Sequence, residues 1–140
     1  MKVALINTNR MQPPVAPIAL DYIAEALHAG GHAVELLDLC WEEEPKSAIA
    51  RFFKGSRYGL IGLTLRNTDD CAFTSGQSFL PGFVELVHAV RENCDAPVVA
   101  GGVGFSVMPE RVLDLSGADF GVWGVGEFVL PELAGLVEDR

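Results

Sequence analysis

Residues 97–106, PVVAGGVGFS, decide the fold that we predict for this chain. An apolar run without polar alternation is typical of a strand that is covered on both faces of a parallel sheet. The run ends in Gly101 and Gly102, and because glycine has no Cβ, another molecule can lie directly against the backbone there. We therefore predict a buried strand whose carboxyl end is open to a ligand.

A second stretch of this kind, ADFGVWGVGE, occupies residues 118–127. Its apolar strand stops at two spaced glycines, Gly124 and Gly126, before an apolar helix. Two neighbouring strand ends without side chains would leave a slot in the sheet edge. We expect a ligand in that slot, and we expect the change Gly102→Leu to abolish binding while the fold stays intact.

The rest of the chain alternates between strand and helix patterns. Apolar runs predict strands at residues 2–7, 32–39, 58–65, 97–100 and 118–123. Helical spacing and proline starts predict helices at residues 18–29, 45–54, 81–92, 109–115 and from about 128 to the end. This alternation indicates an α/β fold, a flavodoxin-like (Rossmann-like) doubly wound parallel sheet of five strands in the order 2-1-3-4-5.

Ligands of such sheets bind beyond the carboxyl ends of the strands. We predict that this edge is lined by residues 7–10, 64–67, 101–106 and 123–127. The polar segment 66–79 adjoins it, and a loop of that length in a compact domain is often functional. The sequence therefore predicts a binding site at this edge.

Charge and cysteine content exclude several classes of function. The net charge of -9 is concentrated in residues 71–140, which hold 3 basic and 10 acidic side chains. Such a surface repels phosphate backbones, so we expect no nucleic acid partner. Three widely spaced cysteines disfavour a disulfide framework or a metal-ligand set. No apolar run approaches the length of a membrane span, and we expect a cytoplasmic protein of one domain, residues 1–140.

Common nucleotide-binding motifs fit poorly. Gly102-Val103-Gly104 has no third glycine at the spacing of a dinucleotide fingerprint, and no glycine is followed by the Lys-Ser or Lys-Thr of a P-loop. A phosphorylated receiver domain needs carboxylates and a lysine at strand ends where this chain has Asn7, Thr64 and Trp123. These three classes of protein are therefore disfavoured.

Three motifs carry a family resemblance: GLT at 62–64, GGVGFSVMPE at 101–110 and ADFGVWGVGE at 118–127. In this order and spacing they resemble the N-terminal cobalamin (vitamin B12)-binding domain of cobalamin-dependent radical SAM proteins. The resemblance covers essentially the whole chain. It implies that the nucleotide tail of cobalamin (methylcobalamin or a related corrinoid) threads between the sheet and a flanking helix.

The resemblance also implies roles for single residues. Thr64 would hydrogen-bond the benzimidazole, Gly101 and Gly102 would let the tail pass, and residues 124–127 would form the motif after the fifth strand. The cofactor-binding residues implied in this way are Thr64, Arg66, Asn67, Gly101, Gly102, Gly104, Phe105, Gly124, Val125, Gly126 and Glu127.

One departure concerns the lower side of the cobalt. Related domains carry D-x-H-x-x-G after the first strand, where this chain reads NTNRMQ at residues 7–12. His28, His32 and His88 all lie away from the predicted edge. We expect base-off cobalamin without a histidine ligand, its lower face meeting Arg66, Asn67 or the Asn9 loop. The alternative that Arg66 is only a solvated loop residue is favoured equally.

The second departure is the lack of a CxxxCxxC motif, since the cysteines are Cys40, Cys71 and Cys94. We expect the 4Fe-4S cluster and S-adenosylmethionine in a radical SAM domain outside this chain. This chain would then be a fragment of a longer protein that contains the radical SAM domain, or it would bind that domain as a separate protein. This chain would hold no complete active site and would present cobalamin for methyl transfer. Two alternatives remain open: a flavodoxin-like FMN- or nucleotide-binding protein, and a degenerate docking domain without a cofactor.

Overall fold

The computed structural model describes residues 1–139. Its centre is one parallel sheet of five strands in the order β2-β1-β3-β4-β5. This confirms the predicted flavodoxin-like fold and strand order. The strands are β1 (Lys2–Asn7), β2 (Ala33–Asp38), β3 (Leu60–Thr64), β4 (Val98–Gly101) and β5 (Phe120–Gly121).

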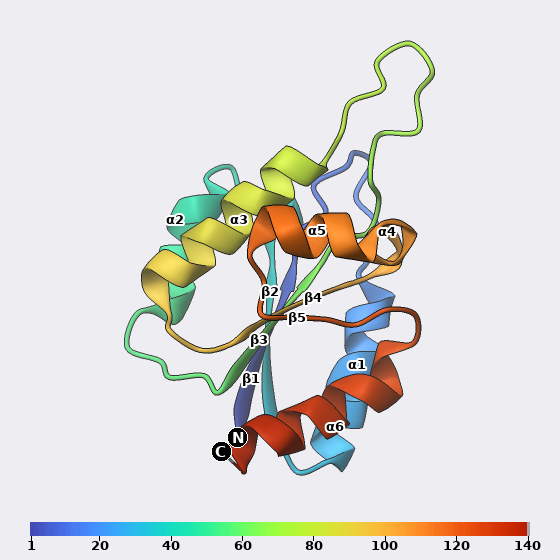
Figure 1. Ribbon diagram of the computed structural model, residues 1–140. Helices are drawn as coiled ribbons and strands as arrows, with labels where there is room; N and C mark the ends of the chain where they lie inside the picture. The colour runs from blue at the N-terminus through green and yellow to red at the C-terminus, as the bar shows by residue number, and fades with distance from the viewer. Residues whose placement is uncertain (140) are drawn as a thin grey trace.

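Helices cover both faces of the sheet (Figure 1). One face carries α1 (Ile18–Ala29) and α6 (Gly126–Glu138), which pack against each other. The other carries α2 (Pro45–Phe53), α3 (Leu80–Asn93), α4 (Val103–Val107) and α5 (Pro109–Ser116). A short 3-10 helix, Leu39–Trp41, follows β2. None of the helices within residues 1–139 is long and apolar enough to cross a membrane.

Strand alternation divides the core into two clusters. The larger one joins one face of the sheet to α2, α3, α4 and α5, and it includes Ile6, Leu63 and Ala100. The smaller one, on the α1 and α6 face, consists of Val3, Leu5, Leu27, Leu60, Val99, Val122, Leu130 and Ala134. Because strand side chains alternate between faces, Gly62 and Gly101 fall on this second face and contribute no side chain to it. The second cluster is therefore thin toward the carboxyl edge.

Two elements differ from the sequence prediction. The fifth strand is only two residues long, because it pairs with β4 alone and the chain turns away after Val122, whose N–H donates to the Ala100 carbonyl at 2.9 Å. The glycine-rich stretch after β4 forms the short helix α4, where we predicted neither a helix nor a strand from the sequence. Gly102 allows this because its φ of 101° lets the chain reverse directly into the helix.

Residues 66–79 form an arm that projects from the body of the domain (Figure 1). The arm is closed by an antiparallel bridge between Asp69 and Ser78 and by the hydrogen bond from Phe79 N–H to the Thr68 carbonyl at 2.9 Å. At its outer end Phe73 is fully exposed. The arm rises from the carboxyl edge, where the predicted site lies.

Tyr58 lies beside the amino end of the sheet, far from that edge. Its ring stacks on Phe52 at a centroid distance of 5.4 Å, and its hydroxyl donates to a Glu35 carboxylate oxygen. The other Glu35 oxygen pairs with Lys2 Nζ at 2.8 Å. Burial first, and the Glu35 carboxylate second, raise the pKa of Tyr58 to about 12.

This shift predicts how stability depends on alkaline pH. The folded state favours neutral tyrosine, so the Tyr58 contribution is complete below the ordinary pKa of 10.0 and is lost as the pH rises toward about 12. Urea unfolding should show a free energy of unfolding that falls across this interval by more in the wild type than in the Tyr58→Phe variant. Equal losses in the two proteins would contradict the assignment.

Candidate functional site

Four residues form one row across the carboxyl edge of the sheet. Asp38 pairs in register with Asn7, Asn7 with Thr64, and Thr64 with Gly101. The Asn7 amide donates to Asp38 Oδ1 at 2.8 Å, which ties the first two strand ends together. Strands β2, β1 and β3 therefore end in polar side chains, whereas β4 ends in Gly101, which has no side chain.

A cavity of about 650 Å³ opens on the α1 and α6 side of this row. We refer to it as the slot. The sheet forms its floor, with Leu5, Gly62, Thr64, Val99 and Gly101. Its walls come from the first turns of α1 and α6 and from their preceding loops, with residues 15–20, Ile23, Val122, Val125, Gly126, Glu127 and Leu130. The predicted slot is thus present as an open cavity with mainly apolar walls.

Glycines on the floor keep the slot open. A Cβ on Gly101 would meet only Val122, at 3.8 Å, and would otherwise point into the cavity. A Cβ on Gly62 would touch Leu5 Cδ2 at 3.0 Å and lie 3.9 Å from Leu130 Cδ2. From the sequence we quoted Gly62 only as part of the motif GLT at residues 62–64 and gave it no role in the site. Its position two residues before Thr64, on the same strand face, was the signal that could have identified it.

Gly102 and Gly104 are glycines for a different reason from the one predicted. A Cβ on Gly102 would lie 2.6 Å from both the Leu65 carbonyl oxygen and Thr64 Oγ1, and one on Gly104 would lie 2.8 Å from the Asn67 carbonyl carbon. These two glycines make room for the chain's own backbone after β3. Gly102→Leu would therefore disturb the fold, contrary to our expectation from the sequence.

Phe105 is placed in the core rather than at the slot. Its side chain is 1% exposed and belongs to the cluster beneath α3 and α5. Its ring lies against Gly121, where a Cβ would be 2.3 Å from Phe105 Cζ. Gly104 is also buried and does not line the slot. Of the predicted cofactor-binding residues, the slot brings together Thr64, Arg66, Gly101, Gly102, Gly124, Val125, Gly126 and Glu127.

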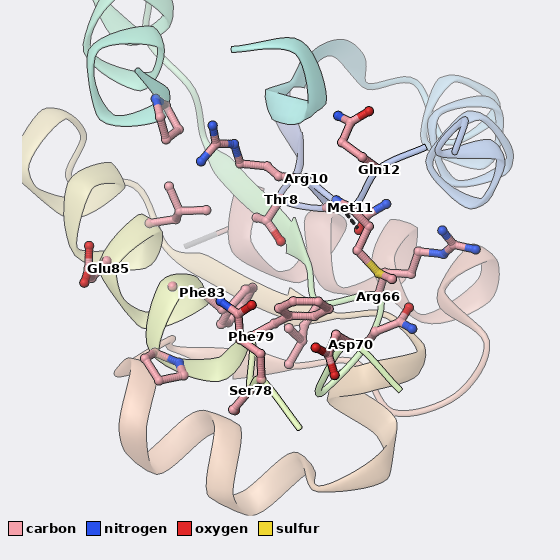
Figure 2. A pocket seen from close by; sticks show the side chains of 18 of the residues that line it. Thr8, Arg10, Met11, Gln12, Arg66, Asp70, Ser78, Phe79, Phe83 and Glu85 are labelled. Atoms are coloured by element: carbon pink, nitrogen blue, oxygen red, sulfur yellow. Dashed lines mark hydrogen bonds between the residues drawn. The ribbon is translucent and has the colours of Figure 1, made fainter. Parts of the chain in front are cut away.

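A second cavity, of about 740 Å³, lies on the other side of the row and is more polar. We refer to it as the polar cavity. Figure 2 shows labelled side chains that line it from the loop after β1, from the 66–79 arm and from α3. Asn67 lines this cavity and not the slot. Two residues, Asn9 and Arg66, belong to the linings of both cavities.

Arg66 carries an exposed guanidinium for which no hydrogen-bond or ion-pair partner is found within residues 1–139. His28 and His88 are exposed on helices, and His32 lies near the chain's amino terminus, where its Nδ1 is 3.3 Å from the Met1 nitrogen. None of these histidines lines either cavity. The described part of the chain also contains no group of three or more His, Cys, Asp or Glu side chains that could hold a metal ion.

A doubly wound sheet with a slot at its carboxyl edge defines a class of small-molecule binding domains. Within that class, residues 5–134 match the model of the B12 binding domain family. The chain therefore belongs to the B12-binding domain family, which confirms the resemblance seen in its motifs.

Relatives of known activity or structure agree with this assignment. The chain is 41% identical over 140 residues to a tryptophan 2-C-methyltransferase of Streptomyces laurentii, covering 99% of this chain and 23% of that protein. It matches the structure of the radical S-adenosylmethionine methyltransferase TsrM from Kitasatospora setae, solved with cobalamin and a [4Fe-4S] cluster, at a TM-score of 0.95 and 38% identity, covering 99% and 24%. The chain thus spans about a quarter of the length of these relatives.

A more distant structure shares only the fold. This is the cobalamin-dependent S-adenosylmethionine radical enzyme OxsB with aqua-cobalamin bound, with a TM-score of 0.75, 17% identity and coverage of 99% of this chain and 19% of that one.

The different roles of two adjacent glycines can be tested by stability. Gly102→Ala should lower the free energy of unfolding by about 1–3 kcal/mol, because it combines left-handed backbone with a backbone clash. Gly101→Ala should change it by less than about 0.5 kcal/mol, since its methyl group meets only Val122, at the ordinary contact distance of 3.8 Å. Denaturant titration of both variants measures the difference. Equal effects would contradict the distinction drawn between the two positions.

Proposed function

We propose that this chain holds cobalamin in the base-off form, with the benzimidazole of the nucleotide tail inside the slot. The observation that carries the proposal is an open, mainly apolar cavity of about 650 Å³ at the carboxyl edge of a B12-binding family member. Its size falls within the range of small-molecule sites, about 300–1,000 Å³. A flat aromatic base would replace water against Val99 of the floor and against Val122 and Leu130 of the walls.

Thr64 would fix the position of the base by a hydrogen bond at the floor of the slot. Its carbonyl oxygen already accepts a hydrogen bond from Thr8 Oγ1 at 2.5 Å, but no side-chain hydrogen bond of its own hydroxyl is found among the described residues. That hydroxyl is therefore free to hydrogen-bond a ring nitrogen of the base. The hydrogen bond from Thr8 to Thr64 uses the single hydroxyl of the loop after β1. An FMN phosphate would therefore lack the Ser and Thr donors that it would need in that loop.

The cobalt would receive no nitrogen ligand from this chain. All three histidines lie away from the two cavities, and the base would be withdrawn into the slot. Arg66 is the residue that we propose for the space below the metal, because it lines both cavities and its side chain is exposed. A cation there would disfavour further positive charge on the cobalt. Asn67 would contact the corrin periphery from the polar cavity.

The bound cofactor supplies a metal centre that can carry a methyl group, while this chain supplies its position and axial surroundings. By likeness to the tryptophan 2-C-methyltransferase, we propose methyl transfer for the whole protein, with a radical SAM domain in the same longer chain. The 4Fe-4S cluster and S-adenosylmethionine would bind in that domain. The three free cysteines, Cys40, Cys71 and Cys94, suit the reducing cytoplasm that we propose as its location.

The binding proposal is tested by mixing the purified chain with hydroxocobalamin, followed by gel filtration and visible spectroscopy. Co-elution of protein and cofactor with a base-off spectrum is the expected result. Protein that elutes without colour would refute the proposal and favour a docking domain that has lost its cofactor.

The place of the base is tested by filling the slot. Gly101→Leu would project its side chain into the cavity and should weaken cobalamin binding at least about tenfold. Gly135→Leu is the matched control, because Gly135 has open space around it in α6 and lines neither cavity. It should bind within about twofold of the wild type. A Gly101→Leu variant that binds like this control would place the base elsewhere.

The axial prediction has its own measurement. Reduction of the complex to the cobalt(II) state followed by electron paramagnetic resonance should show no nitrogen superhyperfine splitting. The physical reason is that neither the benzimidazole nor a histidine donates to the metal. A resolved nitrogen splitting would contradict this arrangement, although it would leave cobalamin binding itself intact.

A further inference from the structure

Asn9 carries a buried donor that the fold does not use. The residue lies in the loop after β1 and is 8% exposed. Within residues 1–139 its Nδ2 is the only buried side-chain nitrogen or oxygen without a hydrogen-bond partner. Leaving a buried donor unpaired costs roughly 1–3 kcal/mol, so an orphan of this kind in a native protein points to a missing partner.

The orientation of this amide is set by its neighbours. Met11 N–H lies 3.4 Å from Asn9 Oδ1, and since an N–H can only donate, the oxygen of the amide must be on that side. Asn9 N–H donates to Asn7 Oδ1 at 3.2 Å, and Asn7 in turn donates to Asp38. These contacts use the backbone N–H and the amide oxygen of Asn9 and leave Nδ2 without a partner among the described residues.

The position of Asn9 is as informative as its unpaired nitrogen. Asn9 lines both the slot and the polar cavity, so it lies where the two meet at the carboxyl edge. A ligand whose flat base fills the slot and whose larger part rests outside it must pass this junction. Asn9 is therefore placed beside the connection between the two parts of the ligand.

The polar cavity has the chemistry of a surface that pairs with amides. Uncharged donors and acceptors line much of it, namely Thr8, Gln12, Asn67, Gln77 and Ser78. The edge of a corrin ring carries carboxamide side chains, and its nucleotide tail begins with a phosphate. Both groups present oxygen acceptors close to the point where tail and ring join.

We propose that Asn9 Nδ2 donates a hydrogen bond to such an oxygen of the bound corrinoid, and that Asn9 thereby selects corrinoids at the junction of the two cavities. This inference rests on the proposed cobalamin binding. It adds a binding residue that the family motifs do not identify. Asn9 positions the ligand and has no part in ligating the metal, because an amide N–H has no lone pair to give.

The test compares Asn9→Leu, a replacement of similar size, with the wild-type chain. Equilibrium dialysis should show cobalamin binding that is about 3- to 10-fold weaker, the effect of losing one uncharged hydrogen bond. The melting temperature without ligand should stay close to that of the wild type, because the change removes an unpaired buried donor and also the long 3.4 Å contact between Met11 N–H and Asn9 Oδ1, and these two effects oppose each other. Asn93→Leu is the matched control: it makes the same chemical change at an exposed position that lines neither cavity, and it should bind within about twofold of the wild type.

Cobinamide, a corrinoid without the nucleotide tail, identifies the acceptor. Equal weakening of cobalamin and cobinamide by Asn9→Leu supports a ring carboxamide oxygen, and weakening of cobalamin alone supports the tail phosphate. Unchanged binding of both corrinoids would overturn the inference, while wild-type binding would still uphold the proposed function. A drop in melting temperature without a loss of affinity would also overturn the inference, because it would show that Asn9 has a structural role. Asn9→Ala should repeat the loss of affinity if the leucine is poorly accommodated. Wild-type chain that binds neither corrinoid would refute both proposals.

Discussion

The carbonyl oxygen of Leu65 fixes the geometry on which the site depends. It accepts hydrogen bonds from the N–H groups of Gly104 at 2.9 Å and Phe105 at 3.3 Å. Gly104 N–H is also 2.9 Å from the Arg66 carbonyl oxygen. This contact draws the turn after β4 against the segment after β3 so closely that neither Gly102 nor Gly104 has space for a Cβ. The carboxyl ends of the two central strands are thereby fixed side by side.

The slot follows from this edge and from the alternation of side chains. Thr64 and Gly101 lie on the face toward α1 and α6, whereas their neighbours Leu63 and Ala100 belong to the larger core on the opposite face. Below them, Leu27, Leu130 and Ala134 bind the two helices to the sheet. Toward the carboxyl edge, Gly62 and Gly101 contribute no side chain to this face, so the first turns of the helices enclose a cavity. Rigid packing below and missing side chains above make one preformed site.

The sequence predicted the fold well, because unbroken apolar runs such as residues 2–7 and the prolines at 45 and 109 are strong local signals. It identified Thr64 and Gly101 correctly as neighbours at the edge. It could not separate a glycine that leaves a cavity open from a glycine that makes room for the chain's own backbone, since Gly101 and Gly102 look alike until residues 64–67 are placed against them. Phe105 and Asn9 were obscured for the same reason: burial and unpaired donors arise only from contacts between distant segments.

The central claim is that the base of a corrinoid enters the slot between the sheet and helices α1 and α6. Nuclear magnetic resonance of the chain bound to diamagnetic hydroxocobalamin tests it most directly. The account predicts nuclear Overhauser contacts from the benzimidazole methyl groups to side-chain methyls of Val99 and Leu130, which line the slot. Contacts from those benzimidazole methyls to residues of the polar cavity alone, with Val99 and Leu130 unaffected by the ligand, would contradict it.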